Sequence, residues 1–282
     1  MSKKNFIRII PKLDIKNGRL IKGINLEGLR ILGEPFSFAE HYYKSGADEI
    51  CYVDNVATLY GTNNLSSFIS KTAKNIFIPL SVGGGIRKLN DIERFLKNGA
   101  DKVCINSAAV DNINFLKKAS KTFGSSTITI IIEYVKIKNK YFISKSAGRD
   151  LVNINPFDWA KKVEDFGAGE VFLTSVNHEG LKKGFDVNVI KKISNDLSIP
   201  VIAHGGAGNI NHIYEVIKNT NISGVSISSL FHYDIAHIFD FKKHKIGNFS
   251  FLEKLIKKKN KPINYLKKVK EFLINKNINV KI

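Results

Sequence analysis

The sequence predicts an α/β protein built as a closed barrel of eight strand–helix units. The first observation is an internal repeat. Gly83 and Gly205 open similar glycine turns, and Asn106 and Ser228 end similar apolar runs, each pair 122 positions apart. The second is that eight apolar runs of strand length recur along 282 residues, an ordinary length for such a barrel. A repeat at half the core length is typical of a (βα)4 unit duplicated into a (βα)8, or TIM, barrel.

The predicted strands are these eight runs, which are mostly continuous rather than alternating, as expected for parallel strands buried on both faces. They cover residues 7–13, 50–53, 76–82, 103–105, 128–132, 171–173, 201–203 and 224–227. Amphipathic segments lie between the runs. This alternation requires crossover connections and therefore a parallel sheet.

Several intervening segments carry helix signals. Asn155 and Pro156 predict the N-cap and first residue of one helix, and Asp186 predicts the N-cap of another. Residues 90–96 show the apolar spacing of a third helix. A closing helix is expected near 265–275.

The composition excludes several classes of protein. No run of about 18 apolar residues predicts a membrane span, and the polar start predicts no signal peptide and a cytoplasmic protein. Cys51 and Cys104 lie in apolar runs and are expected to be buried, reduced thiols. The histidines show no ligand spacing, so we expect no metal and no cofactor. His178, His204 and His232 are expected to be hydrogen-bonded loop or rim residues.

The net charge of +19 raises the question of a nucleic-acid partner. The lysines are spread along the chain and no nucleic-acid-binding motif accompanies them, so we expect no such partner. We expect one domain over residues 1–282. A basic insertion at about 240–263 interrupts the strand–helix rhythm before the closing helix, and the sequence assigns it no function.

Two carboxylates mark the expected active site, since active sites of these barrels lie at the C-terminal ends of the strands. Asp14 ends the first predicted strand and Glu133 ends the fifth. Strands one and five lie on opposite sides of an eight-stranded barrel, so the two groups should face each other across its mouth. Such a pair suits general acid–base chemistry.

The two glycine turns predict phosphate binding at the same mouth. Glycines let the backbone approach an anion closely, and the following helix is expected to add its N-terminal N–H groups. One predicted cradle comprises Gly84, Gly85, Asn106 and Ser107, and the other comprises Gly205, Gly206, Ser228 and Ser229. Two cradles on opposite sides of one mouth imply an elongated substrate with a phosphate at each end.

These segments closely resemble the cyclase subunit of imidazole glycerol phosphate synthase, from histidine biosynthesis. The resemblance covers about residues 5–236 and resumes in the last helix. The most specific matches are residues 8–19, 22–23, 81–86, 99–103, 167–170, 173–175 and 205–208.

The resemblance implies an ammonia-dependent lyase in a heterodimer with a glutaminase subunit. Ammonia from the glutaminase would cross the barrel, cleave a bis-phosphorylated ribulosyl-aminoimidazole carboxamide and close an imidazole ring. Asp14 matches the family's first catalytic aspartate, and the second falls on Glu133. Lys22 matches a flexible-loop lysine, and the resemblance implies further substrate contacts at Thr174, Glu179 and Gly180.

The same resemblance implies a gate for ammonia at the lower end of the barrel. The family closes this end with four charged residues, which match Arg8, Glu49, Lys102 and Glu170, and Asp101 matches a partner-contact position. Two acids and two bases at the N-terminal ends of alternate strands can satisfy one another as a closed ring. An ordinary barrel would fill that layer with apolar side chains.

The departures from the family cluster at the catalytic face. Glu133 is one methylene longer than the usual aspartate, Asn177 and Glu179 stand where the family usually has two aspartates, and His204 replaces a usual serine. A shift of roughly 1 Å can cost about 100-fold in a well-aligned reaction.

These departures leave alternatives open. The chain could be a paralogue that amidates a sugar in surface-glycan biosynthesis, a weak barrel that activates its glutaminase, or the sister isomerase of the same pathway. The charged ring argues against the isomerase. Retention of both cradles favours a bis-phosphate ligand over a nucleotide sugar.

Overall fold

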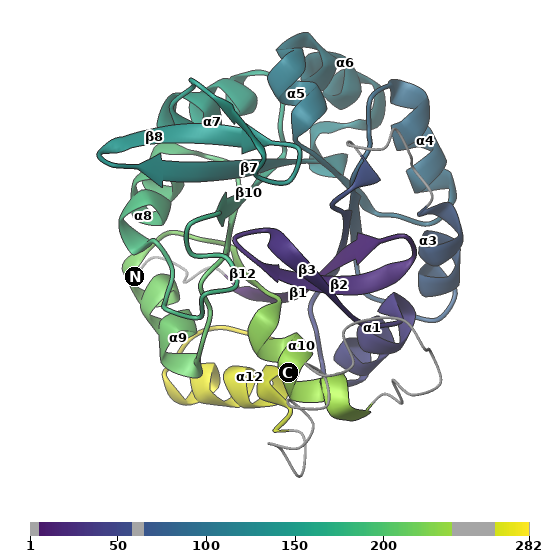
Figure 1. Ribbon diagram of the computed structural model, residues 1–282, viewed down its shortest axis with the longest axis vertical. Helices are drawn as coiled ribbons and strands as arrows, with labels where there is room; N and C mark the ends of the chain where they lie inside the picture. The colour runs from purple at the N-terminus through teal and green to yellow at the C-terminus, as the bar shows by residue number, and fades with distance from the viewer. Residues whose placement is uncertain (1–5, 58–64, 239–262, 282) are drawn as a thin grey trace.

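The computed structural model describes residues 6–57, 65–238 and 263–281, and within them eight parallel strands close into a barrel. The barrel strands are β1 (Arg8–Lys16), β4 (Ile50–Asp54), β5 (Leu80–Gly83), β6 (Lys102–Ile105), β7 (Ile128–Ile137), β10 (Glu170–Ser175), β11 (Val201–His204) and β12 (Gly224–Ile227). Their order is β10-β11-β12-β1-β4-β5-β6-β7, and β7 pairs with β10 to close the circle. The predicted (βα)8 barrel is confirmed (Figure 1).

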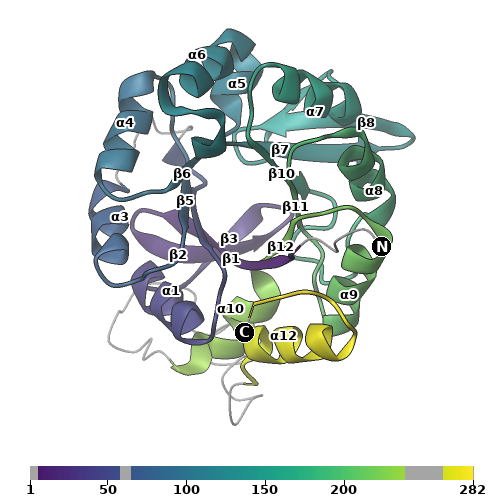
Figure 2. The same cartoon turned by 180° about the vertical axis from the view of Figure 1, so that it is seen from behind.

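Helices surround the strands on the outside (Figures 1 and 2). They are α1 (Pro35–Lys44), α3 (Ser66–Ala73), α4 (Leu89–Lys97), α5 (Ser107–Asp111), α6 (Ile113–Phe123), α7 (Pro156–Asp165), α8 (Val187–Asp196), α9 (Ile210–Asn219), α10 (Ser229–Ile235) and α12 (Tyr265–Asn275), with 3₁₀ turns η1 (Ser125–Thr127) and η2 (Ala236–Ile238). Both predicted N-caps are confirmed. The Asn155 side chain accepts a hydrogen bond from Phe157 N at 2.9 Å, and Asp186 accepts one from Val189 N at 3.4 Å.

One predicted strand is wrong at its start. The run 76–82 was expected to be a strand throughout, but β5 begins only at Leu80. Pro79 has no N–H to donate to a neighbouring strand, and Phe77 is 77% exposed to solvent. The apolar residues before Leu80 therefore form a connection at the lower end of the barrel.

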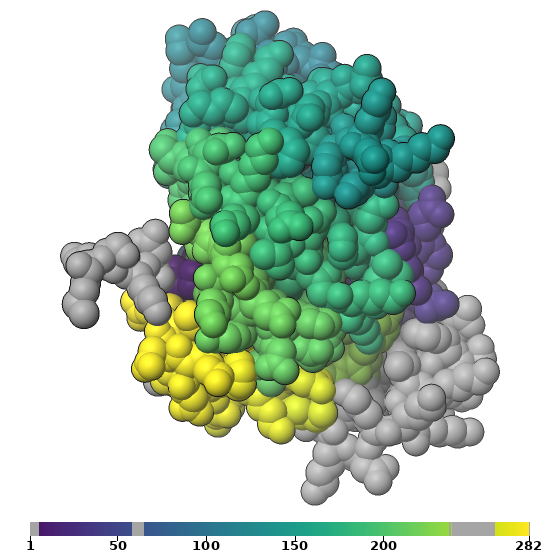
Figure 3. All heavy atoms as spheres, turned by 90° about the vertical axis from the view of Figure 1, so that its left-hand side faces the viewer, coloured from purple at the N-terminus to yellow at the C-terminus, as the bar shows by residue number. Residues whose placement is uncertain are grey.

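Two hairpins extend the barrel and were not predicted. β2 (Arg19–Ile24) pairs antiparallel with β1 and with β3 (Glu27–Gly33). β8 (Lys140–Lys145) pairs antiparallel with β7 and with β9 (Asp150–Val152). The first strand of each half thus continues into a hairpin, which repeats the two-fold relation, and Figure 3 shows the purple β2–β3 and teal β7–β8 hairpins at the same end of the molecule.

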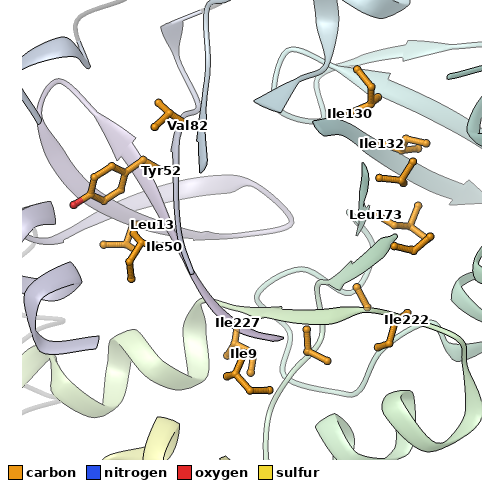
Figure 4. Close-up of a cluster of buried hydrophobic side chains, with 14 of the residues drawn as sticks. Ile9, Leu13, Ile50, Tyr52, Val82, Ile130, Ile132, Leu173, Ile222 and Ile227 are labelled. Atoms are coloured by element: carbon orange, nitrogen blue, oxygen red, sulfur yellow. The ribbon is translucent and has the colours of Figure 1, made fainter. Parts of the chain in front are cut away.

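The main apolar core lies between the strands and the surrounding helices. Ile9, Leu13, Tyr52, Val82 and Leu173 point outward from their strands into this shell (Figure 4). A smaller apolar cluster lies inside the barrel and consists of Ile10, Cys51, Val53, Cys104, Ile131, Phe172 and Ile202. Both cysteines are buried and free, as expected.

Among the described residues, no helix has the length and apolar character needed to cross a membrane. The predicted basic insertion at 240–263 lies outside the described residues, apart from Ile263. The predicted closing helix is confirmed as α12.

Candidate functional site

The interior of the barrel is layered, and β1 passes through every layer. Successive strand residues point to opposite faces, so Arg8, Ile10, Lys12 and Asp14 line the inside. Arg8 belongs to a charged ring at the lower end, and Ile10 belongs to the apolar middle cluster. Lys12 and Asp14 belong to a polar upper layer at the C-terminal ends of the strands.

Asp14 is buried within a group of charges at the upper end. Its carboxylate accepts a hydrogen bond from Lys12 Nζ, and Lys22 Nζ lies 3.8 Å from Asp14 Oδ2. Lys22 also forms an ion pair with Glu179, and all four side chains are buried. Burial alone would raise the pKa of Asp14, but Lys12 and Lys22 outweigh it and hold that pKa at about 2. Asp14 is therefore ionised at neutral pH.

The β2–β3 hairpin is held against the loop that follows β10. Besides the Lys22–Glu179 ion pair, Asn25 N donates to Glu179 O at 2.8 Å. A Cβ at Gly180 would lie 2.6 Å from Gly23 O, so only glycine permits this approach. The structure thus brings the predicted residues Lys22, Glu179 and Gly180 together with Asp14.

Glu133 stands on β7, opposite Asp14 in strand order. Its carboxylate accepts a hydrogen bond from Gly148 N at 3.1 Å. Burial raises the pKa of Glu133 to about 7, and the charge of Lys12 only partly opposes this rise. The negative charge of Asp14 contributes to the rise as well, so the two carboxylates influence each other across the barrel mouth.

The first predicted cradle lines a recess of about 50 Å³ beside Glu133. Gly84, Gly85, Asn106 and Ser107 all line it. Gly84 has a φ of +107°, and a Cβ there would lie 2.5 Å from Asp54 O, so the turn requires glycine.

The second predicted cradle lines a smaller recess of about 10 Å³. Its walls include Gly205, Gly206, Ser228 and Ser229. Gly206 has a φ of +115°, close to that of Gly84, the residue 122 positions earlier in the repeat.

One expectation about the cradles is wrong. The helices that follow the glycine turns were expected to add their N-terminal N–H groups, but α4 begins only at Leu89 and α9 only at Ile210. The short helices α5 and α10 begin instead at Ser107 and Ser229, directly after the neighbouring strands.

Two histidines lie deeper than expected. His204 and His232 were predicted to be loop or rim residues, but His204 is buried at the end of β11 and His232 is buried on α10. His204 Nδ1 lies 3.2 Å from the hydroxyl of Thr174, another predicted site residue. His232 Nε2 donates to Lys12 O at 2.9 Å, and burial lowers the pKa of His232 to about 3. His178 is a hydrogen-bonded loop residue as predicted, with Nδ1 2.8 Å from Ser175 Oγ.

The four predicted gate residues form a closed ring at the lower end of the barrel. Arg8 Nη1 lies 2.8 Å from Glu49 Oε2, and the other Arg8 nitrogen contacts Glu170. Lys102 Nζ lies 3.0 Å from Glu170 Oε2 and 3.5 Å from Glu49 Oε2. Burial would raise the pKa of Glu170, but Arg8 and Lys102 lower it below its usual value. Each acid thus contacts both bases.

Asp101 lies beside this ring, immediately before Lys102 in sequence. Its side chain is exposed, and Oδ2 accepts a hydrogen bond from Leu80 N at 2.8 Å. Asp101 is thus the accessible acid at the lower end of β5 and β6.

Sequence reasoning missed Lys12 and the buried position of His204. A lysine two residues before Asp14, within an apolar strand, was a usable signal because both side chains must face the same side. His204 precedes the second glycine turn, at the C-terminal end of a strand. The same end-of-strand rule that selected Asp14 could have placed it in the upper layer.

Comparisons with known proteins agree with this geometry. The family model described as "Histidine biosynthesis protein" matches residues 8–237. The imidazole glycerol phosphate synthase subunit HisF of Legionella pneumophila is 47% identical over 205 residues, which is 72% of this chain and 97% of that protein. The HisF subunits of Sulfurisphaera tokodaii and Bacillus cereus strain AH187 are 41% and 43% identical, each over 84% of this chain and 94% of the relative. The chain therefore belongs to the histidine biosynthesis protein family, together with the HisF subunits of imidazole glycerol phosphate synthase.

Proposed function

We propose that this chain is the cyclase subunit of an imidazole glycerol phosphate synthase in histidine biosynthesis. It uses ammonia to cleave and cyclise a bis-phosphorylated ribulosyl-aminoimidazole carboxamide. The observation that carries the proposal is a pair of carboxylates with separated pKa values, Asp14 at about 2 and Glu133 at about 7, at a barrel mouth that also holds two glycine cradles. The comparisons do not support the alternative of sugar amidation.

The separated pKa values assign the two acid–base roles. A group with a pKa near neutral can both give and accept a proton during turnover, so Glu133 serves as the general acid. Asp14 stays ionised beside Lys12, and its fixed negative charge stabilises positive charge that develops on the substrate. The hydrogen bond from Gly148 N holds the Glu133 carboxylate in the lining of the first recess.

The two cradles bind the two phosphates of the substrate. Ser226 Oγ and Ser229 Oγ are buried at the second recess without a hydrogen-bond partner among the described residues, which supports a polar ligand there. The first recess offers Asn106, Ser107 and the backbone at Gly84 to the other phosphate.

The charged ring supports the proposed source of ammonia. Arg8, Glu49, Lys102 and Glu170 close the end of the barrel opposite the carboxylates, where ammonia from a second protein must enter. The relatives are named as subunits of a synthase, which implies a partner subunit. We propose that this partner is a glutaminase docked on the lower end as a heterodimer, with Asp101 as a contact.

The remaining expectations stay part of the proposal. We place the enzyme in the cytoplasm, which the two free, buried cysteines support. We also propose that residues 1–282 form one domain, with the basic segment 240–263 as an insertion. No cofactor is needed for the proposed acid–base chemistry.

The test is turnover of the bis-phosphate substrate by the purified chain with ammonium chloride as the nitrogen source. Asp14→Asn should lower kcat by roughly 10²- to 10⁴-fold because it removes the ionised carboxylate. Glu133→Asp should lower kcat by about 100-fold because the shorter side chain withdraws from Gly148 N. Asp111→Asn, a change at an exposed carboxylate, is the control and should leave kcat unchanged. Absence of turnover by the wild-type chain would refute the proposal.

A further inference from the structure

His204 forms part of the inner wall of the second cradle. It is the last residue of β11, immediately before Gly205, and its side chain is buried. Its Nδ1 lies 3.2 Å from Thr174 Oγ1, and its Nε2 lies 3.4 Å from Ser228 Oγ. Glu179 Oε1 lies 3.7 Å from the same Nε2. The ring therefore lies among the residues of the recess, within reach of a bound anion.

The hydrogen bonds show which ring nitrogen of His204 must carry a proton. Ser228 Oγ donates to Lys12 O at 2.8 Å, so it can only accept from His204. Nε2 of His204 therefore carries a proton. When the ring is neutral, Nδ1 accepts from the hydroxyl of Thr174.

The surroundings explain why the ring is neutral without a ligand. Burial lowers the pKa of His204 well below its usual value, and nearby positive charge lowers it further. The titratable groups that face the ring are Lys12 and Asp14 on β1, Lys22 on β2, Glu179 after β10, and His232 on α10. Lys12 and Lys22 oppose protonation by their positive charge, whereas Asp14 favours it, and His232 is itself neutral.

The same recess contains a concentration of unpaired polar atoms. Ser226 Oγ and Ser229 Oγ are buried and have no hydrogen-bond partner among the described residues, and both hydroxyls line the recess with His204, where they can donate to an anion. The recess of about 10 Å³ matches one water or one phosphate oxygen. These features indicate that the recess is completed by a ligand.

We propose that His204 is a specificity-determining residue that takes up one proton from solvent when a phosphate group binds the second cradle, and then holds the phosphate as an imidazolium. This inference rests on the second cradle of the proposed function. The chemical class that it selects is a dianionic phosphate, because a second negative charge best offsets the lysines that otherwise oppose protonation.

The protonated ring would find an acceptor for each N–H. Nδ1 can donate to Thr174 Oγ1, since a hydroxyl can reverse its role, and Nε2 faces the phosphate, Glu179 and Ser228. A charge-assisted hydrogen bond to phosphate is roughly twice as strong as a neutral one. His204 would thus couple phosphate binding to proton uptake.

The test is a histidine NMR titration of the full chain, labelled at the imidazole carbons, with sodium sulfate as the probe. Sulfate is a dianion that does not titrate between pH 5.5 and 8.5, so any proton uptake belongs to the protein. His204→Gln identifies the His204 resonance by its loss. The pKa of His204 should rise by about one unit or more between the free and the sulfate-saturated protein. His41, on α1 and outside the recess, is the control, and sulfate should leave its resonance unchanged.

A second readout is the pH dependence of sulfate affinity at this site. As the pH rises between the free and bound pKa values of His204, sulfate affinity should fall, by at most about tenfold for each pH unit. His204→Gln keeps a hydrogen-bonding side chain but cannot take the charge, so this dependence should disappear. An unchanged His204 resonance in saturating sulfate, or no sulfate binding at all, would overturn the inference.

Ammonium-dependent turnover, measured without sulfate, separates this inference from the proposed function. Turnover by the wild-type chain together with an unchanged His204 titration would overturn the inference alone. A shifted titration without turnover would leave the anion site in place and overturn the proposed cyclase reaction.

Discussion

Replacing Asp14 with asparagine tests the charge network of the upper layer. The pKa of this buried carboxyl is held at about 2, against an ordinary value of 3.8. A lowering of roughly two units corresponds to about 2–3 kcal/mol of stability at neutral pH. The variant also leaves Lys12 without its anionic partner, and breaking one side of a buried ion pair costs about 3–5 kcal/mol. We therefore expect Asp14→Asn to lower the free energy of unfolding by about 3 kcal/mol.

The assay is reversible urea unfolding at pH 7, repeated at several pH values. The matched control is Asp111→Asn, which removes an ion pair to Lys145 in which Asp111 is 58% exposed. Such a surface pair contributes about 0–1 kcal/mol. If Asp14→Asn lowers the free energy of unfolding no more than Asp111→Asn does, the reasoning is refuted.

The pH dependence gives a second check with a definite sign. The folded pKa of Asp14 is depressed, so its contribution is present above the unfolded pKa of 3.8 and is lost as the pH falls towards 2. The difference between wild type and Asp14→Asn should be constant from about pH 8 to pH 5 and narrow below about pH 4. A stability difference between wild type and Asp14→Asn that changes near neutral pH would contradict the lowered pKa of Asp14.

Three further changes test other parts of the site. The folded pKa of Glu133 is raised from 4.5 to about 7, so the wild-type chain should lose stability as the pH rises from 5 to 7.5. Glu133→Gln should reduce this loss in urea unfolding. The same variant should remove the change in kcat/KM that occurs near neutral pH. Lys102→Met removes the contacts of Lys102 Nζ with Glu170 at 3.0 Å and with Glu49 at 3.5 Å in the partly exposed lower ring. The free energy of unfolding in urea should fall by about 2 kcal/mol. An unchanged free energy would contradict a stabilising role for these ion pairs. Gly206→Ala places a Cβ 2.0 Å from Gly184 O at a φ of +115°, so calorimetry should show a lower Tm, and an unchanged Tm would contradict this close approach.

The sequence was sufficient for the barrel because its signals were repeated. The 122-residue offset and the apolar runs specify eight strands, since a parallel strand covered on both faces must be apolar. The hairpins were missed although Asn17-Gly18 is a strong hairpin signal. Both residues have positive φ angles, 48° and 71°, and they join β1 to β2.

The site could be predicted where function imposes a residue type at a strand end. That rule selected the proposed residues Asp14 and Glu133 and the glycine turns, and the structure places all of them at the upper end of the barrel. The pairing of Lys22 with Glu179 could not be found this way, because it depends on how the β2–β3 hairpin folds over the mouth. The depth of His204 depends on three-dimensional packing against Thr174 and Ser228, which are distant in sequence.

The most direct test of the central claim follows nitrogen from ammonia into the product. The purified wild-type chain is given the bis-phosphate substrate and ¹⁵N-ammonium chloride, and the product is analysed by mass spectrometry and NMR. The account predicts one ¹⁵N atom in the imidazole ring, with labelled product lost in Asp14→Asn. Substrate cleavage without label in the ring, or no product at all, would contradict it.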